Sequence, residues 1–245
     1  MSTKASPGSF EALRAACCEG NRKLPQLGIV DLTFGNLSVC DRDLGVMAIK
    51  PSGVDYDVLT PGDIVLVSLE GEKEIKVHSG HLKPSSDTPT HKCLYRSFRQ
   101  VNCIVHTHSR RATAFAQAGL SIPCFGTTHA DFFCGEVPVT REMTPEEVSS
   151  DYEWNTGKVI VDRFSSLDPS ATEAVLIRHH GPFVWGSSVS KALDTAYALE
   201  VIAEMALDTL RLENSAAVIP KYLHEKHFKR KHGPQAYYGQ ENPAG

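Results

Sequence analysis

Short apolar runs, each bounded by turn-forming residues, constrain the fold of this chain more than any other feature. The runs at 30–33, 37–40, 46–49 and 64–68 have the length and composition of β-strands. Asp, Gly and Pro residues lie between them and predict turns. Strands in such a succession commonly pair with their neighbours, so the pattern predicts antiparallel pairing.

Helical patterns precede and follow these runs. An amphipathic pattern covers 9–24, and a helix is expected over 86–98, where a Ser-Asp pair can cap the first backbone N–H groups. A capping box of Thr, Pro and Glu opens a further helix over 144–164. The stretch at 190–212 is rich in strong helix formers. Together, helices and strands predict an α/β fold.

Two later apolar runs add to this prediction. We expect strands at 102–108 and 174–178. Within the helix at 190–212, Tyr197 and Met205 fall on the apolar stripe. We therefore expect both side chains to pack in the core rather than contact a cofactor.

Length and composition favour one domain. The chain has 245 residues, of which 41% are hydrophobic, and can bury a core. We expect one domain over residues 1–240 and a disordered tail at 241–245. Positive and negative residues are interspersed, with a net charge of −4, so neither a nucleic acid nor a membrane is expected as partner. The basic segment at 221–231 is more typical of a solvated helix face than of an anion site.

Cysteine usage indicates a reducing compartment. The 7 cysteines form no CxxC pair, and an odd number cannot all pair within one chain. The first residues lack the apolar core of a signal peptide, and no apolar run is long enough to cross a bilayer. We therefore expect a cytoplasmic protein.

Two histidines lie one residue apart in a predicted strand. Side chains alternate faces along a strand, so His106 and His108 project to the same side at about one chelating span. Such a pair arises easily by chance in a chain with 11 histidines. A further imidazole from His179-His180 and the carboxylate of Asp87 strengthen it, although Asp87 alone is also typical of a helix cap. These residues predict a divalent metal site with a position open for substrate.

Two short segments have the residues of an anion-binding turn. They are KPSG at 50–53, after a strand, and KPSS at 83–86, before a helix. Each offers a cation, hydroxyl groups and backbone N–H groups, and a helix N-terminus favours a dianion. Either segment alone is more often an ordinary turn. The chain has no Walker motif and no GxGxxG, so nucleotide binding is not supported.

Longer motifs extend both predicted sites. They are GN (35–36), KPSGVDY (50–56), PSSDTPTH (84–91), IVHTHS (104–109), GTTHAD (126–131) and AYYGQ (236–240). In these motifs the chain resembles the L-ribulose-5-phosphate 4-epimerases of the class II aldolase family. The resemblance covers nearly the whole chain.

The resemblance implies a single-domain, three-layer α/β/α fold with a mostly antiparallel central sheet, and a homotetramer with active sites between subunits. It implies a Zn²⁺ ion, or another divalent cation such as Mn²⁺ or Co²⁺, on Asp87, His106, His108 and His180. Contacts to a phosphorylated ketopentose would come from Asn36, Lys50, Ser52, Gly53, Ser85, Ser86, Thr127, His227 and Arg230. The catalytic acid and base would be Asp131 and Tyr238, the latter from a neighbouring subunit.

Position 87 separates two activities within this resemblance. An epimerase would be a metal-dependent isomerase acting on L-ribulose 5-phosphate and D-xylulose 5-phosphate. Fuculose-phosphate-type aldolases carry Glu after the paired serines, whereas this chain has Asp87.

A non-catalytic interaction module of the same fold is a further alternative, which the presence of all four ligands disfavours. The chain departs from the pattern at Phe34, where many relatives have Trp, and at Arg178-His179, which bears on substrate preference.

Overall fold

A single mixed α/β domain is built on a central sheet, as the computed structural model shows for residues 9–232 and 236–237. The 7 strands of this described part have the order β4-β3-β2-β1-β5-β7-β6, and each pairs antiparallel with its neighbours. The strands are β1 (Asn36–Asp41), β2 (Val46–Ile49), β3 (Val65–Ser68), β4 (Val77–Ser79), β5 (Cys103–His106), β6 (Ala174–Leu176) and β7 (Pro182–Gly186). The predicted antiparallel sheet is confirmed.

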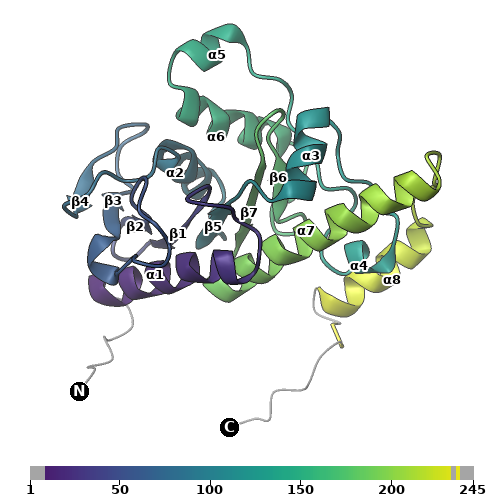
Figure 1. The fold of residues 1–245 in the computed structure, drawn as a ribbon, viewed down its shortest axis with the longest axis horizontal. Coiled ribbons are helices and arrows are strands. Elements are labelled where there is room, and N and C mark those ends of the chain that lie inside the picture. The colour runs from purple at the N-terminus through teal and green to yellow at the C-terminus, as the bar shows by residue number, and fades with distance from the viewer. Residues whose placement is uncertain (1–8, 233–235, 238–245) are drawn as a thin grey trace.

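Helices cover both faces of the sheet (Figure 1). They are α1 (Phe10–Gln26), the 3₁₀ turn η1 (Pro61–Asp63), α2 (Thr88–Ser97), α3 (Arg110–Ala118), α4 (Thr127–Ala130), α5 (Pro145–Ser149), α6 (Tyr152–Arg163), α7 (Val189–Leu212) and α8 (Lys221–Lys231). Helices α1 and α7 pack on one face, and α2 and α6 pack on the other. Within residues 9–232 and 236–237, none of these helices has both the length and the apolar character that a membrane span requires.

Alternate residues of the strands enter two different cores. On β2, Val46 and Ala48 pack in the core that includes α1 and α7 residues. Met47 and Ile49 pack in the core that includes α2 and α6 residues. All four are buried, because successive strand side chains point to opposite faces and both faces are covered. This confirms the three-layer α/β/α architecture.

Two predicted elements differ in the structure. Residues 30–33 form a turn rather than a strand, and Leu32 has a φ of 52°, which is incompatible with extended backbone. The expected helix over 144–164 is two helices, because Ser150 leaves helical geometry at φ −105° and ψ −122° between α5 and α6. Thr33, at the end of the turn, and Tyr152, at the start of α6, both line the cavity described below.

Two side chains of α7 expected in the core are exposed. Tyr197 is 48% exposed and Met205 is 51% exposed, so this prediction is wrong. The buried stripe of α7 includes the small residues Ala196, Ala203 and Ala206. Small residues allow the helix to approach the sheet closely, whereas Tyr197 and Met205 lie on its outer flank.

Candidate metal and sugar-phosphate site

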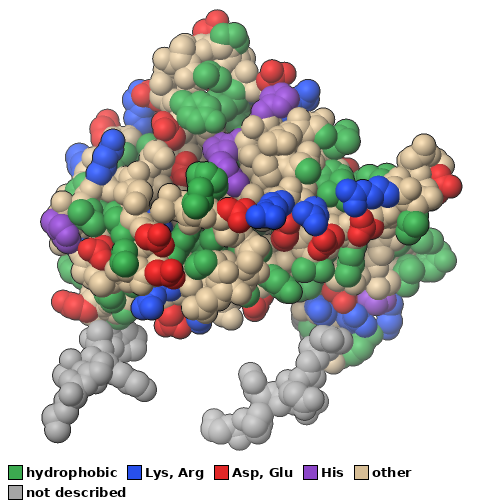
Figure 2. All heavy atoms as spheres, in the orientation of Figure 1, with side chains coloured by type: hydrophobic (Ala, Val, Ile, Leu, Met, Phe, Trp, Pro, Cys, Tyr) green, Lys and Arg blue, Asp and Glu red, His purple; other side chains and the backbone are tan. Residues whose placement is uncertain are grey.

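One cavity collects most of the residues predicted to bind metal or phosphate. It has a volume of about 490 Å³ and lies where β1 begins and β5 ends, because the strand register places Asn36 opposite His106. Figure 2 shows histidine side chains in the hollow beneath the lobe that α5 and α6 form. The predicted site residues that line the cavity are Asn36, Lys50, Ser52, Gly53, Ser85, Ser86, Asp87, His106, His108 and His180.

Three of these histidines form a compact cluster. One ring nitrogen from each of His106, His108 and His180 lies within 4.8 Å of the others. The ring centroids are 4.8 Å apart for His106 and His180, and 5.0 Å apart for the other two pairs. His106 ends β5, His108 follows it, and His180 lies in the turn between β6 and β7. Because β7 pairs with β5, this turn brings the third imidazole to the first two.

The chemistry of the three rings fits a divalent metal. Nδ1 of His106 lies 3.0 Å from the carbonyl oxygen of Pro182, which can only accept, so Nδ1 donates its proton and Nε2 presents a lone pair. Burial lowers the pKa of His180 to about 4 and also lowers that of His108. Neutral imidazoles are the form that ligates metals. Three such ligands beside an open cavity match a catalytic metal site.

Gly35 allows the start of β1 to lie against the histidine strand. Its φ is 91°, and a Cβ at this position would lie 2.5 Å from the carbonyl oxygen of His106. The next residue, Asn36, donates through its amide nitrogen to Ser85 Oγ at 3.1 Å and to Asp87 Oδ2 at 2.6 Å. Asn36 therefore orients Ser85 and Asp87, and its expected contact with phosphate stays a prediction.

Asp87 precedes α2, but its side chain makes no capping hydrogen bond to the helix. Burial would raise the pKa of Asp87, yet the nearby imidazoles of His106 and His91 and the hydrogen bond from Asn36 keep it below its usual value. The carboxylate is thus ionised and close to the histidines. Asp87 is not part of the group whose ligand atoms lie within 4.8 Å of one another, and its role as a fourth ligand stays a prediction.

The two predicted anion-binding turns lie side by side. The backbone N–H of Ser52 donates to the carbonyl oxygen of Lys83 at 3.0 Å, and that of Ser85 donates to the carbonyl oxygen of Lys50 at 3.1 Å. This reciprocal pairing joins segments that are separated by about 30 residues in the sequence. It places both serines at one end of the cavity that contains the histidines.

Further groups at this end suit a phosphate. In the part of the chain that the structure describes, the backbone N–H groups of Gly53 and Ser86 have no backbone acceptor. The side chain of Lys50 is buried, with Nζ 4.7 Å from the centre of the Tyr56 ring. Burial lowers the pKa of Lys50. Nζ of Lys50 has one long hydrogen bond, to the carbonyl oxygen of Pro51 at 3.5 Å. A dianionic group would give this ammonium a stronger acceptor and would give the two N–H groups an acceptor that the backbone does not supply.

Asp131 belongs to a separate cluster formed by α4 and α8. Arg230 donates to its two carboxylate oxygens at 2.9 and 2.6 Å, and Nδ1 of His227 lies 3.0 Å away. Burial would raise the pKa of Asp131, but the hydrogen bonds from Arg230 and His227 outweigh it and lower the pKa. Thr127 begins α4, and its carbonyl oxygen accepts from the backbone N–H of Asp131 at 2.9 Å. None of these residues lines the histidine cavity, and Tyr238 lies outside the described residues.

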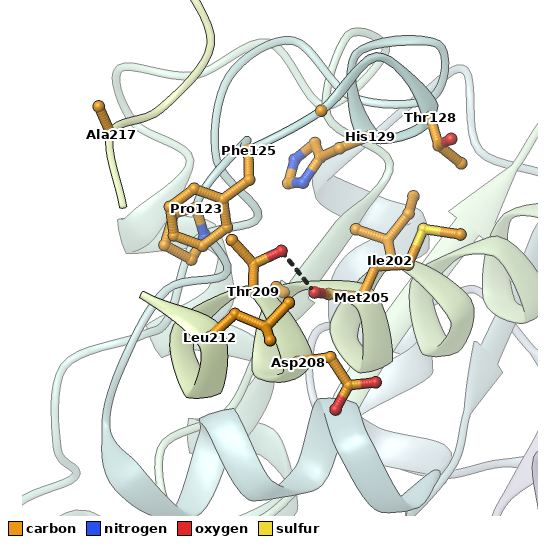
Figure 3. Close-up of a pocket in the computed structure, with 12 residues that line it drawn as sticks. Pro123, Phe125, Thr128, His129, Ile202, Met205, Asp208, Thr209, Leu212 and Ala217 are labelled. Atoms are coloured by element: carbon orange, nitrogen blue, oxygen red, sulfur yellow. Dashed lines mark hydrogen bonds between the residues drawn. The ribbon is translucent and has the colours of Figure 1, made fainter. Parts of the chain in front are cut away.

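A second cavity of about 460 Å³ lies between α4 and the C-terminal half of α7 (Figure 3). Its lining is largely apolar and includes Phe125, Ile202 and Leu212. Its polar lining residues are Thr128, His129, Asp208 and Thr209. Nε2 of His129 lies 2.8 Å from the carbonyl oxygen of Gly135. Among the described residues, the three-histidine group is the one that could hold a metal, and it lies in the first cavity.

Two residues of α6 line the histidine cavity although no sequence motif predicts them. They are Tyr152 and Glu153, the first residues of the helix. The hydroxyl oxygen of Tyr152 lies 3.4 Å from Nδ1 of His180. In the sequence these residues lie within a region expected to be continuous helix, and only the break before α6 turns them toward the histidines.

The antiparallel three-layer domain with its histidine cluster defines a class II aldolase-like protein. Residues 15–207 match the family model described as Class II Aldolase and Adducin N-terminal domain. The chain belongs to this family, which confirms the family named by the motifs. Because the description covers both aldolases and adducin, membership alone does not assign a reaction.

Solved structures share the fold. An L-fuculose 1-phosphate aldolase has a TM-score of 0.73 at 24% identity, covering 88% of this chain and 93% of that chain. YgbL from Klebsiella pneumoniae, described as a putative aldolase/epimerase/decarboxylase, has a TM-score of 0.69 at 26% identity, covering 89% and 98%. L-fuculose 1-phosphate aldolase from Glaciozyma antarctica PI12 has a TM-score of 0.70 at 17% identity, covering 96% and 88%.

Proposed function

We propose that the protein is an L-ribulose-5-phosphate 4-epimerase, a metal-dependent isomerase that interconverts L-ribulose 5-phosphate and D-xylulose 5-phosphate. One observation carries this proposal: the histidine cluster and the paired anion-binding turns line the same cavity. A ketopentose 5-phosphate has its phosphate at one end and adjacent carbonyl and hydroxyl oxygens toward the other. The two ends of the cavity complement these two parts.

The difficulty of the reaction lies at C4. Removing the C4 proton would leave an unstabilised carbanion, because C4 is not adjacent to the carbonyl carbon. Cleavage of the C3–C4 bond avoids this: the C4 hydroxyl loses its proton, and the bonding electrons remain on the three-carbon fragment as an enediolate. The other fragment is glycolaldehyde phosphate. Addition of the enediolate to the opposite face of the aldehyde restores the bond with C4 inverted, and the C4 oxygen regains a proton.

The residues of the cavity would divide this work. A divalent ion held by His106, His108 and His180, with Asp87 as the proposed fourth ligand, would act as a Lewis acid toward the ketone and hydroxyl oxygens. The phosphate would be held by donors at the other end, which include Asn36, Lys50, Ser52, Gly53, Ser85 and Ser86. This anchor would retain glycolaldehyde phosphate while its carbonyl group turns.

Proton transfer to and from the C4 oxygen would fall to Asp131 and Tyr238. Asp131 does not line the cavity of its own chain, so the proposal requires a second copy to bring the α4–α8 cluster to it. A homotetramer with active sites between subunits meets this requirement. Thr127, His227 and Arg230 would reach the substrate from the same side.

The proposal is tested by loading the protein with Zn²⁺, Mn²⁺ or Co²⁺ and adding L-ribulose 5-phosphate. We expect D-xylulose 5-phosphate to form with at least one ion. Release of dihydroxyacetone phosphate from L-fuculose 1-phosphate is measured in parallel. Absence of epimerisation with all three ions would reject the assignment.

A sugar-phosphate aldolase is the second candidate, because two of the similar structures are L-fuculose 1-phosphate aldolases. An aldolase must place a proton on an enediolate carbon, whereas the epimerase must leave that carbon unprotonated. Asp87 is one methylene shorter than Glu, and Asn36 holds its carboxylate at 2.6 Å. This short, tethered carboxylate favours the epimerase. Faster cleavage of L-fuculose 1-phosphate than epimerisation of L-ribulose 5-phosphate would favour the aldolase.

A further inference from the structure

The three histidines differ in what supports each ring from behind. His106 has the carbonyl oxygen of Pro182 at 3.0 Å from its Nδ1. The ring of His108 stacks on Phe34, with centroids 5.9 Å apart and an angle of 27° between the planes. Nδ1 of His180 lies 3.4 Å from the hydroxyl oxygen of Tyr152.

We propose that Tyr152 is a positioning residue of the metal site, whose hydroxyl oxygen accepts a hydrogen bond from Nδ1–H of His180 and thereby directs Nε2 at the ion. The proposal rests on the proposed function only in that the histidine cluster binds a divalent metal. It concerns neither the substrate nor the proton transfers.

Ligand chemistry requires such a partner. An imidazole that ligates through one nitrogen carries its proton on the other, and that N–H needs an acceptor that fixes the tautomer and the ring orientation. Tyr152 Oη lies 3.4 Å from Nδ1 of His180, so Nε2 is the nitrogen left for the metal. Burial raises the pKa of Tyr152, which keeps the phenol neutral and protonated. The contact is longer than an optimal N–H···O bond and can tighten when an ion draws the ring into place.

His180 needs this support more than the other two ligands. His106 ends β5, which is flanked by β1 and β7 in the middle of the sheet. His180 instead lies in the turn after β6, the last strand of the sheet, and follows His179, which has a φ of 65°. A non-glycine residue at positive φ is strained, and the turn is closed by the hydrogen bond from the N–H of Ile177 to the oxygen of Gly181 at 2.9 Å.

The position of Tyr152 is itself well defined. Thr90 of α2 donates through Oγ1 to the carbonyl oxygen of Glu153 at 2.5 Å, which ties the start of α6 to α2. Thr156 donates to the carbonyl oxygen of Tyr152 at 2.9 Å. Because Asp87 directly precedes α2, the same packed pair of helices places the proposed fourth ligand and the group that orients His180.

The test is Tyr152→Phe, which removes one oxygen and keeps the ring. We expect the affinity for Zn²⁺, measured by competition with a chelator, to fall about 10- to 100-fold, the usual cost of losing such a partner. The visible absorption spectrum of the Co²⁺-loaded variant should also change. The matched control is Tyr197→Phe on the outer flank of α7, where the side chain is 48% exposed, and it should leave both measurements unchanged.

Reference variants complete the experiment. His180→Asn sets the scale for a lost ligand, and Thr90→Val, which frees the start of α6, should weaken Zn²⁺ binding by a few-fold. Circular dichroism confirms that each variant is folded. Tyr152→Phe binding Zn²⁺ within twofold of the wild type, while His180→Asn binds it weakly, would overturn the proposal. These measurements need no substrate, so failure of the proposed reaction and failure of this inference are separate outcomes.

Discussion

The histidine cavity and the Asp131 cluster are both built from buried polar groups, but they differ in how those groups are satisfied. In the cavity, three imidazoles of like character face one another within 4.8 Å. In the cluster, the carboxylate of Asp131 accepts from Arg230 and lies 3.0 Å from His227. The first arrangement directs ligand atoms toward one point, whereas the second contains its own counter-charges.

This difference indicates how a complete active site would be assembled. The carboxylate of Asp131 has counter-charges in its own chain, from Arg230 and Lys231, so the cluster can hold its shape without substrate. It can therefore be presented to another chain as a preformed surface. A cavity with converging lone pairs becomes complete only when a metal and a phosphate arrive. One chain would therefore contribute the binding half of the site, and a neighbour the proton-transfer half.

Removing a metal ligand should have the largest effect. We expect His106→Asn to lose bound metal and to lower turnover of L-ribulose 5-phosphate by about a thousandfold or more, because the Lewis acid contributes several kcal/mol. A chelator should inactivate the wild type equally, with recovery on adding Zn²⁺. Activity that persists in metal-free protein would contradict this view of the cavity.

Substituting the proposed proton-transfer residues should leave the metal in place. Asp131→Asn is expected to lower epimerisation by about a hundredfold or more, as for a general acid or base, while metal content stays at the wild-type level. Tyr238→Phe should behave in the same way. Wild-type turnover in both variants would remove these residues from the mechanism.

Mixed oligomers would sharpen the comparison. His106→Asn and Asp131→Asn protomers should each have low activity alone. Unfolding and refolding them together should restore part of the activity, because some sites then combine an intact cavity with an intact cluster. Each variant refolded alone is the control. No recovery from a mixture shown to form mixed oligomers would place both halves within one chain.

A single phosphate contact should have a smaller effect. Ser52→Ala is expected to raise KM for L-ribulose 5-phosphate about tenfold with little change in kcat, since one hydrogen bond to a charged group is lost. Activity on unphosphorylated L-ribulose, if measurable, should be insensitive to the change. An effect of equal size on both substrates would argue against a phosphate role for this turn.

The last prediction concerns the stability of the protein rather than its activity, through His129 of α4. Burial lowers the pKa of His129 to about 4, while an unfolded histidine titrates near about 6.5. Between these values the unfolded state binds more protons, so stability falls as pH decreases from about 6.5 to about 4, by about 3 kcal/mol at most. Asp131, with its lowered pKa, would add a loss only at still lower pH.

His129→Gln tests this assignment, because Gln can keep a donor toward Gly135 without titrating. Denaturant unfolding of metal-free protein at several pH values should show a shallower decline for the variant than for the wild type. Parallel declines would assign the pH dependence to other groups.

Local patterns in the sequence predicted much of the framework. The strands β1, β2 and β3 and the starts of α2, α5 and α7 follow from apolar runs, turn residues and caps, which act over a few neighbouring residues. The pair His106 and His108 was predictable for the same reason, because alternation along a strand is local. Strands β4 and β7 were not, since β4 is short and exposed and β7 begins with Pro182.

Contacts between distant segments required the folded chain. The turn at 30–33, the break before Tyr152 and the exposure of Tyr197 depend on neighbours that no local pattern describes. The same holds for the pairing of the two anion-binding turns and for the separation of Asp131 from the histidines. Sequence motifs and hydrophobic periodicity show which residues have suitable chemistry. Long-range packing decides which of those residues come into contact, because packing is the sum of many weak contacts across the whole domain.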